Sequence, residues 1–390
     1  MDNCVIPQGY KATALGIIPQ EWEVKKLGEV GKLLSGLTYT PSNIQSDGIL
    51  VLRSSNIQNG VLAFDDNVYV NVSSYTPVKA GDILICVRNG SQNLIGKTAL
   101  ITQEAEGCAF GAFMAVFRSP ISKYVFYLLG TELYRKYIFR NLGATINSIN
   151  GSDLKKFRFP FPPLAEQRKI AEVLGVWDEA IEKQARLIEK LALRKRALMQ
   201  RLLSAKLRLP GFSEPWKKVK LGDVASIKTG NKNNEDKIAN GQYPFFVRSS
   251  IVERINTYSY DGEAILIPGE GKIGEIIHYI NGKFDYHQRV YKISDFSNCS
   301  GLFLYYYLMY FFGKQAINNS VKACVDSLRL STFTNMTIIH PPISEQTAIA
   351  EVLTAADREI ELAKEKLERL RRQKRGLMQQ LLTGKKRVKC

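Results

Sequence analysis

The chain contains one long segment twice. The first copy, residues 163–204, reads PLAEQRKIAEVLGVWDEAIEKQARLIEKLALRKRALMQRLLS, and the second, residues 342–383, reads PISEQTAIAEVLTAADREIELAKEKLERLRRQKRGLMQQLLT. The copies align without a gap at an offset of 179 residues, and about half of the aligned positions are identical. A duplication of this length predicts a chain built from two similar halves.

Apolar residues recur in both copies at alternating spacings of four and three. The row is apolar at eight of ten positions in the first copy and at nine of ten in the second; its first-copy positions are 170, 174, 177, 181, 184, 188, 191, 195, 198 and 202. This spacing predicts one long helix per copy, about 58 Å over residues 165–203, with the row as a coiled-coil seam. Lys195 and Lys374 interrupt both seams at the same position, where they either set the register or extend to solvent at the seam edge.

Each predicted helix follows a pair of prolines, at 162–163 and 341–342. Proline is compatible with the first turn of a helix but disfavours helix upstream of it. Both helices are therefore expected to begin just after these pairs, with Ser344 as the N-cap of the second helix.

The residues before each long helix also resemble each other. WEVKKLGEV at 22–30 matches WKKVKLGDV at 216–224, and Arg-Ser-Ser occurs at both 53–55 and 248–250. Short apolar runs predict strands at 49–52, 82–87, 98–101, 113–117, 244–247, 264–267, 275–280 and 290–293, and helices at 124–139 and 302–314. We therefore predict an α+β fold with globular domains at 1–160 and 207–340, and long helices at 161–206 and 341–390, the second with a basic tail.

The composition indicates a folded, basic protein. Of 390 residues 45% are hydrophobic, and the formal net charge is +17 with a pI near 9.5, which favours a polyanionic partner, most often nucleic acid. The six cysteines form no CxxC pair, which argues against a zinc site and against a disulfide-rich secreted fold. No signal peptide is visible and the most apolar stretch, residues 302–312, is too short to span a bilayer, so we expect a cytoplasmic protein without a membrane partner.

Motifs for catalysis are weak or missing in the sequence. Residues 269–274 fit G-x-G-x-x-G, but the strand-like run that follows them favours a hairpin or loop over a nucleotide-binding turn. Asp261 with Glu270 and Lys272 resembles a nuclease triad in composition only, and no Asn/Asp-Pro-Pro-aromatic motif of a methyltransferase occurs. We predict no catalytic, cofactor-binding or metal-binding residue in this chain.

Side chains that can read DNA cluster in the predicted loops. Arginine pairs with guanine, asparagine and glutamine pair with adenine, and glycine lets the backbone approach phosphate. The candidates are Arg53, Ser54, Asn56, Arg88, Asn89, Gln92 and Lys97 in the first domain and Arg248, Ser249, Lys272, Gln288 and Arg289 in the second. For each of them the alternative is an ordinary solvated loop side chain.

Residues shared between the two domains are expected to serve a different purpose from those that differ. Arg53 and Arg248 are shared, so we expect them to position phosphate or support the fold. Arg88, Asn89 and Lys272 differ between the domains and are the better candidates for base reading.

The repeated segments carry a family resemblance. PLAEQRKIAEVL with PISEQTAIAEVL, the helix ends LMQRLL and LMQQLLTGKK, and the connector LPGF-x3-W-x4-LG are similar to those of specificity subunits of type I restriction-modification systems. The resemblance covers nearly the whole chain. It implies two target-recognition domains separated by two long helices that pair as an antiparallel coiled coil, with an internal pseudo-twofold repeat.

The same resemblance implies that DNA recognition and catalysis are carried out by different subunits. Each recognition domain would bind one half of a bipartite, asymmetric site in double-stranded DNA, with the first domain on the 5′ half and the helices setting the spacing. The chain would be non-catalytic and hold no cofactor; it would bind two modification (methyltransferase) subunits and, through them, the restriction subunits. S-adenosylmethionine, ATP and Mg would be bound by those partners. A stand-alone DNA methyltransferase or nuclease with unrecognised motifs, and a basic coiled-coil docking protein, remain the alternatives.

Overall fold

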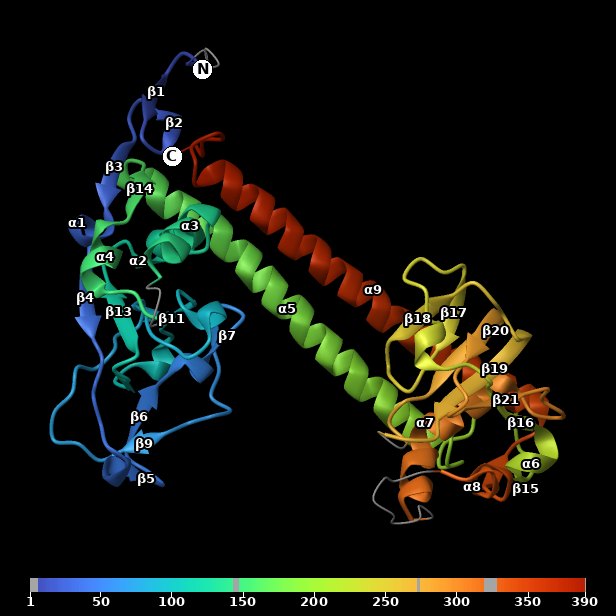
Figure 1. Cartoon of the computed structure of the whole chain (residues 1–390). Helices are drawn as coiled ribbons and strands as arrows, with labels where there is room; N and C mark the ends of the chain where they lie inside the picture. The colour runs from blue at the N-terminus through green and yellow to red at the C-terminus, as the bar shows by residue number, and fades with distance from the viewer. Residues whose placement is uncertain (1–5, 143–146, 272–273, 319–327, 390) are drawn as a thin grey trace. The chain divides into compact units, whose positions relative to one another are not determined.

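The chain folds into two compact units. The computed structural model describes residues 6–142, 147–271, 274–318 and 328–389 (Figure 1). The first unit comprises Met1–Lys183 and Leu367–Cys390, and the second comprises Gln184–Lys366. The two long helices, α5 (Leu164–Leu202) and α9 (Ile343–Leu381), therefore each contribute residues to both units.

Two four-stranded sheets and a layer of short helices form the globular part of the first unit. Its strands are β1 (Tyr10–Thr13), β2 (Gly16–Pro19), β3 (Glu23–Lys26), β4 (Lys32–Ser35), β5 (Ile44–Gln45), β6 (Ile49–Leu52), β7 (Ile57–Gln58), β8 (Val61–Leu62), β9 (Tyr69–Val70), β10 (Ile83–Cys86), β11 (Thr98–Leu100), β12 (Ala109–Phe110), β13 (Met114–Arg118) and β14 (Arg158–Phe161). Its helices are α1 (Leu27–Val30), α2 (Ser122–Leu128), α3 (Glu132–Asn141) and α4 (Gly151–Lys156). The sheet orders are β11-β10-β13-β4 and β12-β6-β9-β5. All four side chains of β10 are buried, so this strand is central to the core.

One six-stranded sheet organises the second unit, in the order β16-β21-β19-β20-β17-β18. The strands are β15 (Lys217–Lys220), β16 (Ser226–Thr229), β17 (Tyr243–Phe246), β18 (Val252–Ile255), β19 (Tyr260–Pro268), β20 (His278–Tyr286), β21 (Val290–Ser294) and β22 (Thr337–His340), and the helices are α6 (Leu221–Val224), α7 (Gly301–Asn318) and α8 (Leu330–Thr334). The apolar face of α7 packs in the same core as the first turns of α9. Within the described ranges, no helix is long and apolar enough to cross a membrane.

In each globular part, the last strand pairs with a strand near the start of that part. β3 pairs antiparallel with β14 in the first unit, and β15 pairs antiparallel with β22 in the second. The chain therefore enters and leaves each globular part at one place, directly before the long helix that follows.

The long helices run antiparallel to each other within each unit. In the first unit Glu166 bonds Arg387 and Asp178 bonds Lys374. The residue number of the partner therefore falls as the residue number along α5 rises. In the second unit the Gln184 Nε2 donates to the Ala363 carbonyl (3.0 Å), and Lys195 pairs with Asp357 further along. The seam predicted from the heptad spacing is thus confirmed, including its buried polar Gln184.

Both seam lysines end in ion pairs and not in solvent. The Lys374 ammonium bonds Asp178 and the Lys195 ammonium bonds Asp357, and their side chains are only 16% and 13% exposed. Each ammonium also lies over a tyrosine ring, of Tyr127 or Tyr306. Extension to solvent at the seam edge, one of the two interpretations, is therefore wrong because an acid and a ring on neighbouring helices hold each lysine.

The same tyrosines fasten each globular part to the helices. The Tyr127 hydroxyl donates to Asp178 Oδ2 (2.7 Å), and the Tyr306 hydroxyl donates to Asp357 Oδ2 (2.8 Å). Burial and the adjacent carboxylate both raise the pKa of these tyrosines, so each stays a hydrogen-bond donor at neutral pH.

A buried glutamate lies in the first turn of each long helix. Glu166 accepts bonds from Arg387 Nε (2.6 Å) and Nη2 (2.9 Å), and from Trp22 Nε1 (3.1 Å). Glu345 accepts bonds from Arg208 Nε (2.6 Å) and Nη2 (2.7 Å). Each arginine follows the end of the other long helix, and hydrogen bonding to the carboxylate raises its pKa.

Three details of the expected secondary structure are wrong. The helix expected at 124–139 is two helices, because the chain turns at Gly130 and Thr131 begins α3 by accepting the Tyr134 N–H (3.4 Å). Ser344 lies inside the first turn of α9 and is not its N-cap. The strand expected at 275–280 is instead β20, which begins at His278 and extends to Tyr286.

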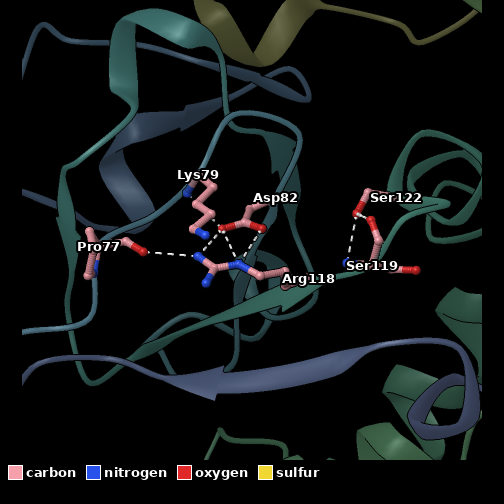
Figure 2. A network of polar contacts seen from close by, with 6 residues as sticks. All are labelled: Pro77, Lys79, Asp82, Arg118, Ser119 and Ser122. Atoms are coloured by element: carbon pink, nitrogen blue, oxygen red, sulfur yellow. Dashed lines mark hydrogen bonds and ion pairs between the residues drawn. The ribbon is translucent and has the colours of Figure 1, made fainter.

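A second buried ion pair secures the far end of β10 in the first unit. Arg118 Nε donates to Asp82 Oδ1 (2.9 Å) and Arg118 Nη2 donates to Asp82 Oδ2 (2.7 Å) and to the Pro77 carbonyl (3.0 Å) (Figure 2). The Lys79 backbone N–H also donates to Asp82 Oδ2 (2.8 Å). These contacts fix β10 and β13 together at the end opposite the candidate reading loops.

Arg387→Ala is expected to destabilise the first unit, because it leaves the Glu166 carboxylate buried without its partner. Breaking such a pair costs about 3–5 kcal/mol when both groups are buried. The Arg387 side chain is 38% exposed, so we expect a loss of about 2–3 kcal/mol in the free energy of unfolding, measured by urea titration with circular dichroism. The matched control is Arg371→Ala, which removes an exposed pair with Glu368 and should cost about 0.5 kcal/mol or less. Equal losses in the two variants would contradict a supporting role for the buried pair.

Candidate nucleic-acid interface

Two loops of the first unit bring most of the predicted DNA-reading residues together. One loop follows β6 and the other follows β10. The Asn89 Nδ2 donates to Ser54 Oγ (2.9 Å) and so joins the two loops. The Asn147 Nδ2 donates to the Gly90 carbonyl (2.9 Å) from a third segment. The loops therefore form one polar surface at the ends of two strands.

The cations of this surface differ in their exposure and in their contacts. Arg53 Nη2 forms an ion pair with Asp66 Oδ2 (2.9 Å) and also donates to the Asp66 carbonyl (3.2 Å). Arg88 is exposed, and its guanidinium lies 5.6 Å from the centre of the Phe113 ring. Gln92 is exposed in a short 3-10 turn, and Lys97 is exposed just before β11.

Asn56 is a structural residue of its loop. It is fully buried, its Oδ1 accepts the Arg53 N–H (2.9 Å) and its Nδ2 donates to the Ala63 carbonyl (2.9 Å). A side chain without exposed surface cannot reach a base edge, so its prediction as a DNA contact is wrong. Asparagine in a loop satisfies the local backbone in this way because its amide both donates and accepts.

The corresponding surface of the second unit is organised by one glutamate. Glu270 Oε2 pairs with Arg248 Nη1 (3.2 Å), and Glu270 Oε1 pairs with Arg289 Nε (3.4 Å). The His287 Nδ1 accepts the Arg289 backbone N–H (2.9 Å). Burial, with the nearby Arg248, lowers the His287 pKa, which keeps the ring neutral as this bond requires.

The remaining candidates of the second unit lie on the same loops. The Ser249 hydroxyl donates to the Ile251 carbonyl (3.0 Å), which shapes the turn after β17. The Gln288 Nε2 donates to Asn233 Oδ1 (2.6 Å), so the turn before β21 contacts the asparagine-rich loop that follows β16. Lys272 lies outside the described residues.

Phe113, Asp66 and Glu270 are members of these surfaces that the sequence did not identify as such. An exposed phenylalanine and a loop acid have no distinctive spacing in the sequence. Only the fold shows that each lies beside a predicted DNA-reading arginine.

The segment that fits the glycine-rich motif connects two antiparallel strands. β19 ends at Pro268, β20 begins at His278, and the two strands pair with each other. The expected hairpin is confirmed for the described part of the segment. Asp261 lies near the start of β19 and Glu270 just beyond its end, about 30 Å apart along an extended chain. These two acids therefore cannot share a nuclease site.

Asn56→Ala is expected to act on stability and not on base preference. The change leaves two partly buried backbone groups without the Asn56 amide, so the free energy of unfolding should fall by about 1–3 kcal/mol, measured by chemical denaturation. Gln92→Ala is the control, because this exposed side chain should change stability by no more than about 0.5 kcal/mol. Full stability combined with altered base preference in the Asn56 variant would contradict the structural assignment.

Comparison with known proteins gives a consistent result. The family model of the type I restriction modification DNA specificity domain matches residues 19–192 and 213–372. The putative type I restriction enzyme MjaX specificity subunit of Methanocaldococcus jannaschii is 27% identical over 443 residues, which cover 98% of this chain and 97% of that protein. The EcoKI specificity subunit of Escherichia coli is 33% identical over 170 residues, which cover 41% of this chain and 36% of that protein.

A solved structure shares the fold. The S subunit of the type I restriction-modification system from M. genitalium superposes with a TM-score of 0.61 at 18% identity, covering 93% of this chain and 96% of that one. The α+β fold with two similar domains and long helices, expected from the sequence, is thereby confirmed. Because the family model matches both halves of this chain and most of the chain's length, the chain belongs to the family of type I restriction-modification DNA specificity proteins.

Proposed function

We propose that this chain is the subunit that selects the DNA sequence for a type I restriction-modification enzyme. The observation that carries the proposal is the contrast between scaffold and loops. The contacts of the helices repeat in both units, as in the pairs Glu166–Arg387 and Glu345–Arg208, whereas the loops carry different side chains on a similar frame. A protein that reads two unlike half-sites needs such an arrangement.

We assign one half-site to each globular part. Residues 1–160 and 207–340 are the proposed target-recognition domains, and residues 161–206 and 341–390 are the proposed spacer helices. The first domain would bind the 5′ half and the second the 3′ half of an asymmetric site in double-stranded DNA. The formal net charge of +17 supports a polyanionic ligand. Because DNA is the proposed ligand, we expect the chain to act in the cytoplasm.

We assign the chemistry to partner subunits. The hairpin geometry of the glycine-rich segment and the separation of Asp261 from Glu270 argue against catalysis by these groups. The target adenine would be flipped out of the DNA double helix into a methyltransferase pocket of the modification subunit. S-adenosylmethionine would be bound there, and ATP and Mg would be bound by the complete complex.

The long helices are the proposed docking surface for two modification subunits, which in turn would recruit the restriction subunits. Apolar side chains remain exposed along these helices, including Val176 and Leu193 on α5 and Leu362 on α9. We propose that these side chains contribute to the contact with the modification subunits.

The test compares the chain alone with the chain bound to its modification subunit. The chain alone should transfer no methyl group from S-adenosylmethionine to DNA. The complex should bind its site at least a thousandfold more tightly than random DNA at about 150 mM salt, and its affinity should fall steeply as salt increases. Methylation by the chain alone would overturn the non-catalytic assignment. Binding by the complex that is indifferent to both salt and sequence would favour a coiled-coil docking protein.

A further inference from the structure

In the first unit, the side chains of Arg88 and Phe113 meet just beyond the end of β10 and just before the start of β13. Cys86 of β10 pairs with Met114 of β13. One residue beyond, the Val87 N–H donates to the Phe113 carbonyl (3.0 Å). Arg88 then follows on one strand, diagonally across from Phe113 on the other, with its guanidinium over the Phe113 ring.

The second unit has the same backbone arrangement where β19 and β21 end. Pro268 of β19 pairs with Val290 of β21. One residue beyond, the Gly269 N–H donates to the Arg289 carbonyl (2.8 Å). Glu270 then follows on one strand, diagonally across from Arg289 on the other.

The register therefore makes Arg88 correspond to Glu270, and Phe113 to Arg289. Each unit carries one arginine and one partner at these two positions, but their order is reversed. Arg88 lies over the Phe113 ring in the first unit, and Arg289 pairs with Glu270 in the second. Gap-free alignment of the loops does not show this relation, because the two loops differ in sequence and length.

The exposure of Phe113 is difficult to explain by stability alone. Its side chain is 55% exposed at the tip of the turn before β13, and the Arg88 guanidinium packs on it. An aromatic face under a guanidinium orients the plane of the donors and leaves them free at the edge. Among the described residues, no ion pair or hydrogen bond of the Arg88 guanidinium is found.

Glu270 gives Arg289 an orientation by a different interaction. Glu270 Oε1 forms an ion pair with the Arg289 Nε (3.4 Å), which leaves the terminal nitrogens of a 61% exposed side chain available. Glu270 Oε2 also pairs with Arg248, so both carboxylate oxygens have a partner. The Glu270 side chain is only 21% exposed. An arginine held in a fixed plane is the usual partner for the O6 and N7 atoms of guanine in the major groove.

We propose that Arg88 and Arg289 each read a guanine, one in each half-site, and that Phe113 and Glu270 are their positioning residues. The proposal rests on the proposed function, because it presumes that the loops of each unit contact one half-site. On the shared backbone frame the reading arginine then has a different place in each unit, because Arg88 follows β10 whereas Arg289 precedes β21.

The first experiment uses the full chain in complex with its modification subunit and a randomised DNA library. Arg88→Lys keeps the charge but loses the two parallel hydrogen bonds, so preference for guanine should fall about 10- to 100-fold at one position of one half-site. Arg289→Lys should give the same loss at one position of the other half-site. Phe113→Ala should weaken the preference at the Arg88 position, and Phe113→Tyr should restore it.

Lys97→Ala is the matched control in the first unit. Its exposed ammonium, on a neighbouring loop, is expected to contact phosphate at most. The variant should therefore lower the affinity for all DNA sequences by a similar factor. If Arg88→Lys or Arg289→Lys leaves every base preference unchanged, or lowers the affinity for all DNA sequences uniformly, these arginines do not read guanine. A wild-type complex that selects no sequence would instead overturn the proposed function itself.

Glu270→Gln separates positioning from general electrostatics. Removing a negative charge beside DNA should raise the affinity for random sequence several-fold, because less repulsion opposes the phosphates. The same change should lower guanine preference at the Arg289 position, because its guanidinium loses its anchor. Affinity and specificity moving in opposite directions would support the proposal. A gain in affinity with base preference unchanged would show that Glu270 does not position Arg289.

Discussion

The structure depends on a buried carboxylate at the start of each long helix. Glu166 and Glu345 are almost without solvent contact, and an unpaired charge there would be costly. The arginine that neutralises each carboxylate follows the end of the other long helix, at Arg387 or Arg208. The beginning of one helix is thus tied to the end of the other within each unit, and this tie fixes the antiparallel direction of the pair.

A second repeated contact connects the helices to the globular parts. Tyr127 and Tyr306 come from the helices that cover the sheets, and each bonds an aspartate that also neutralises a seam lysine. The tyrosine and the aspartate of the first set recur 179 residues later in the second, and the two seam lysines lie 179 residues apart with their sets exchanged. The duplication therefore preserves the scaffold contacts, while the loops at the strand ends diverge. Selection of DNA sequence can then change without disturbing the frame.

The sequence predicts the parts of this structure that depend on local pattern. The long helices and the strand at 49–52 follow from apolar spacing, which reflects backbone geometry alone. The roles of individual polar residues depend on contacts distant in sequence. Asn56 looks like a DNA contact until its amide is seen to be used by the loop, and the seam lysines look exposed until their acids are located. Phe113 had no signal in the sequence, because its importance comes from a partner 25 residues away.

The central claim is that two independent reading units share one scaffold, and domain exchange tests it most directly. Residues 22–159 can be replaced by the matching segment of a specificity subunit with a known site, because β3 and β14 pair and the segment ends lie together. Library selection with the chimeric complex should give the donor's first half-site joined to this chain's own second half-site. A change in both half-sites, or in neither, would contradict the account.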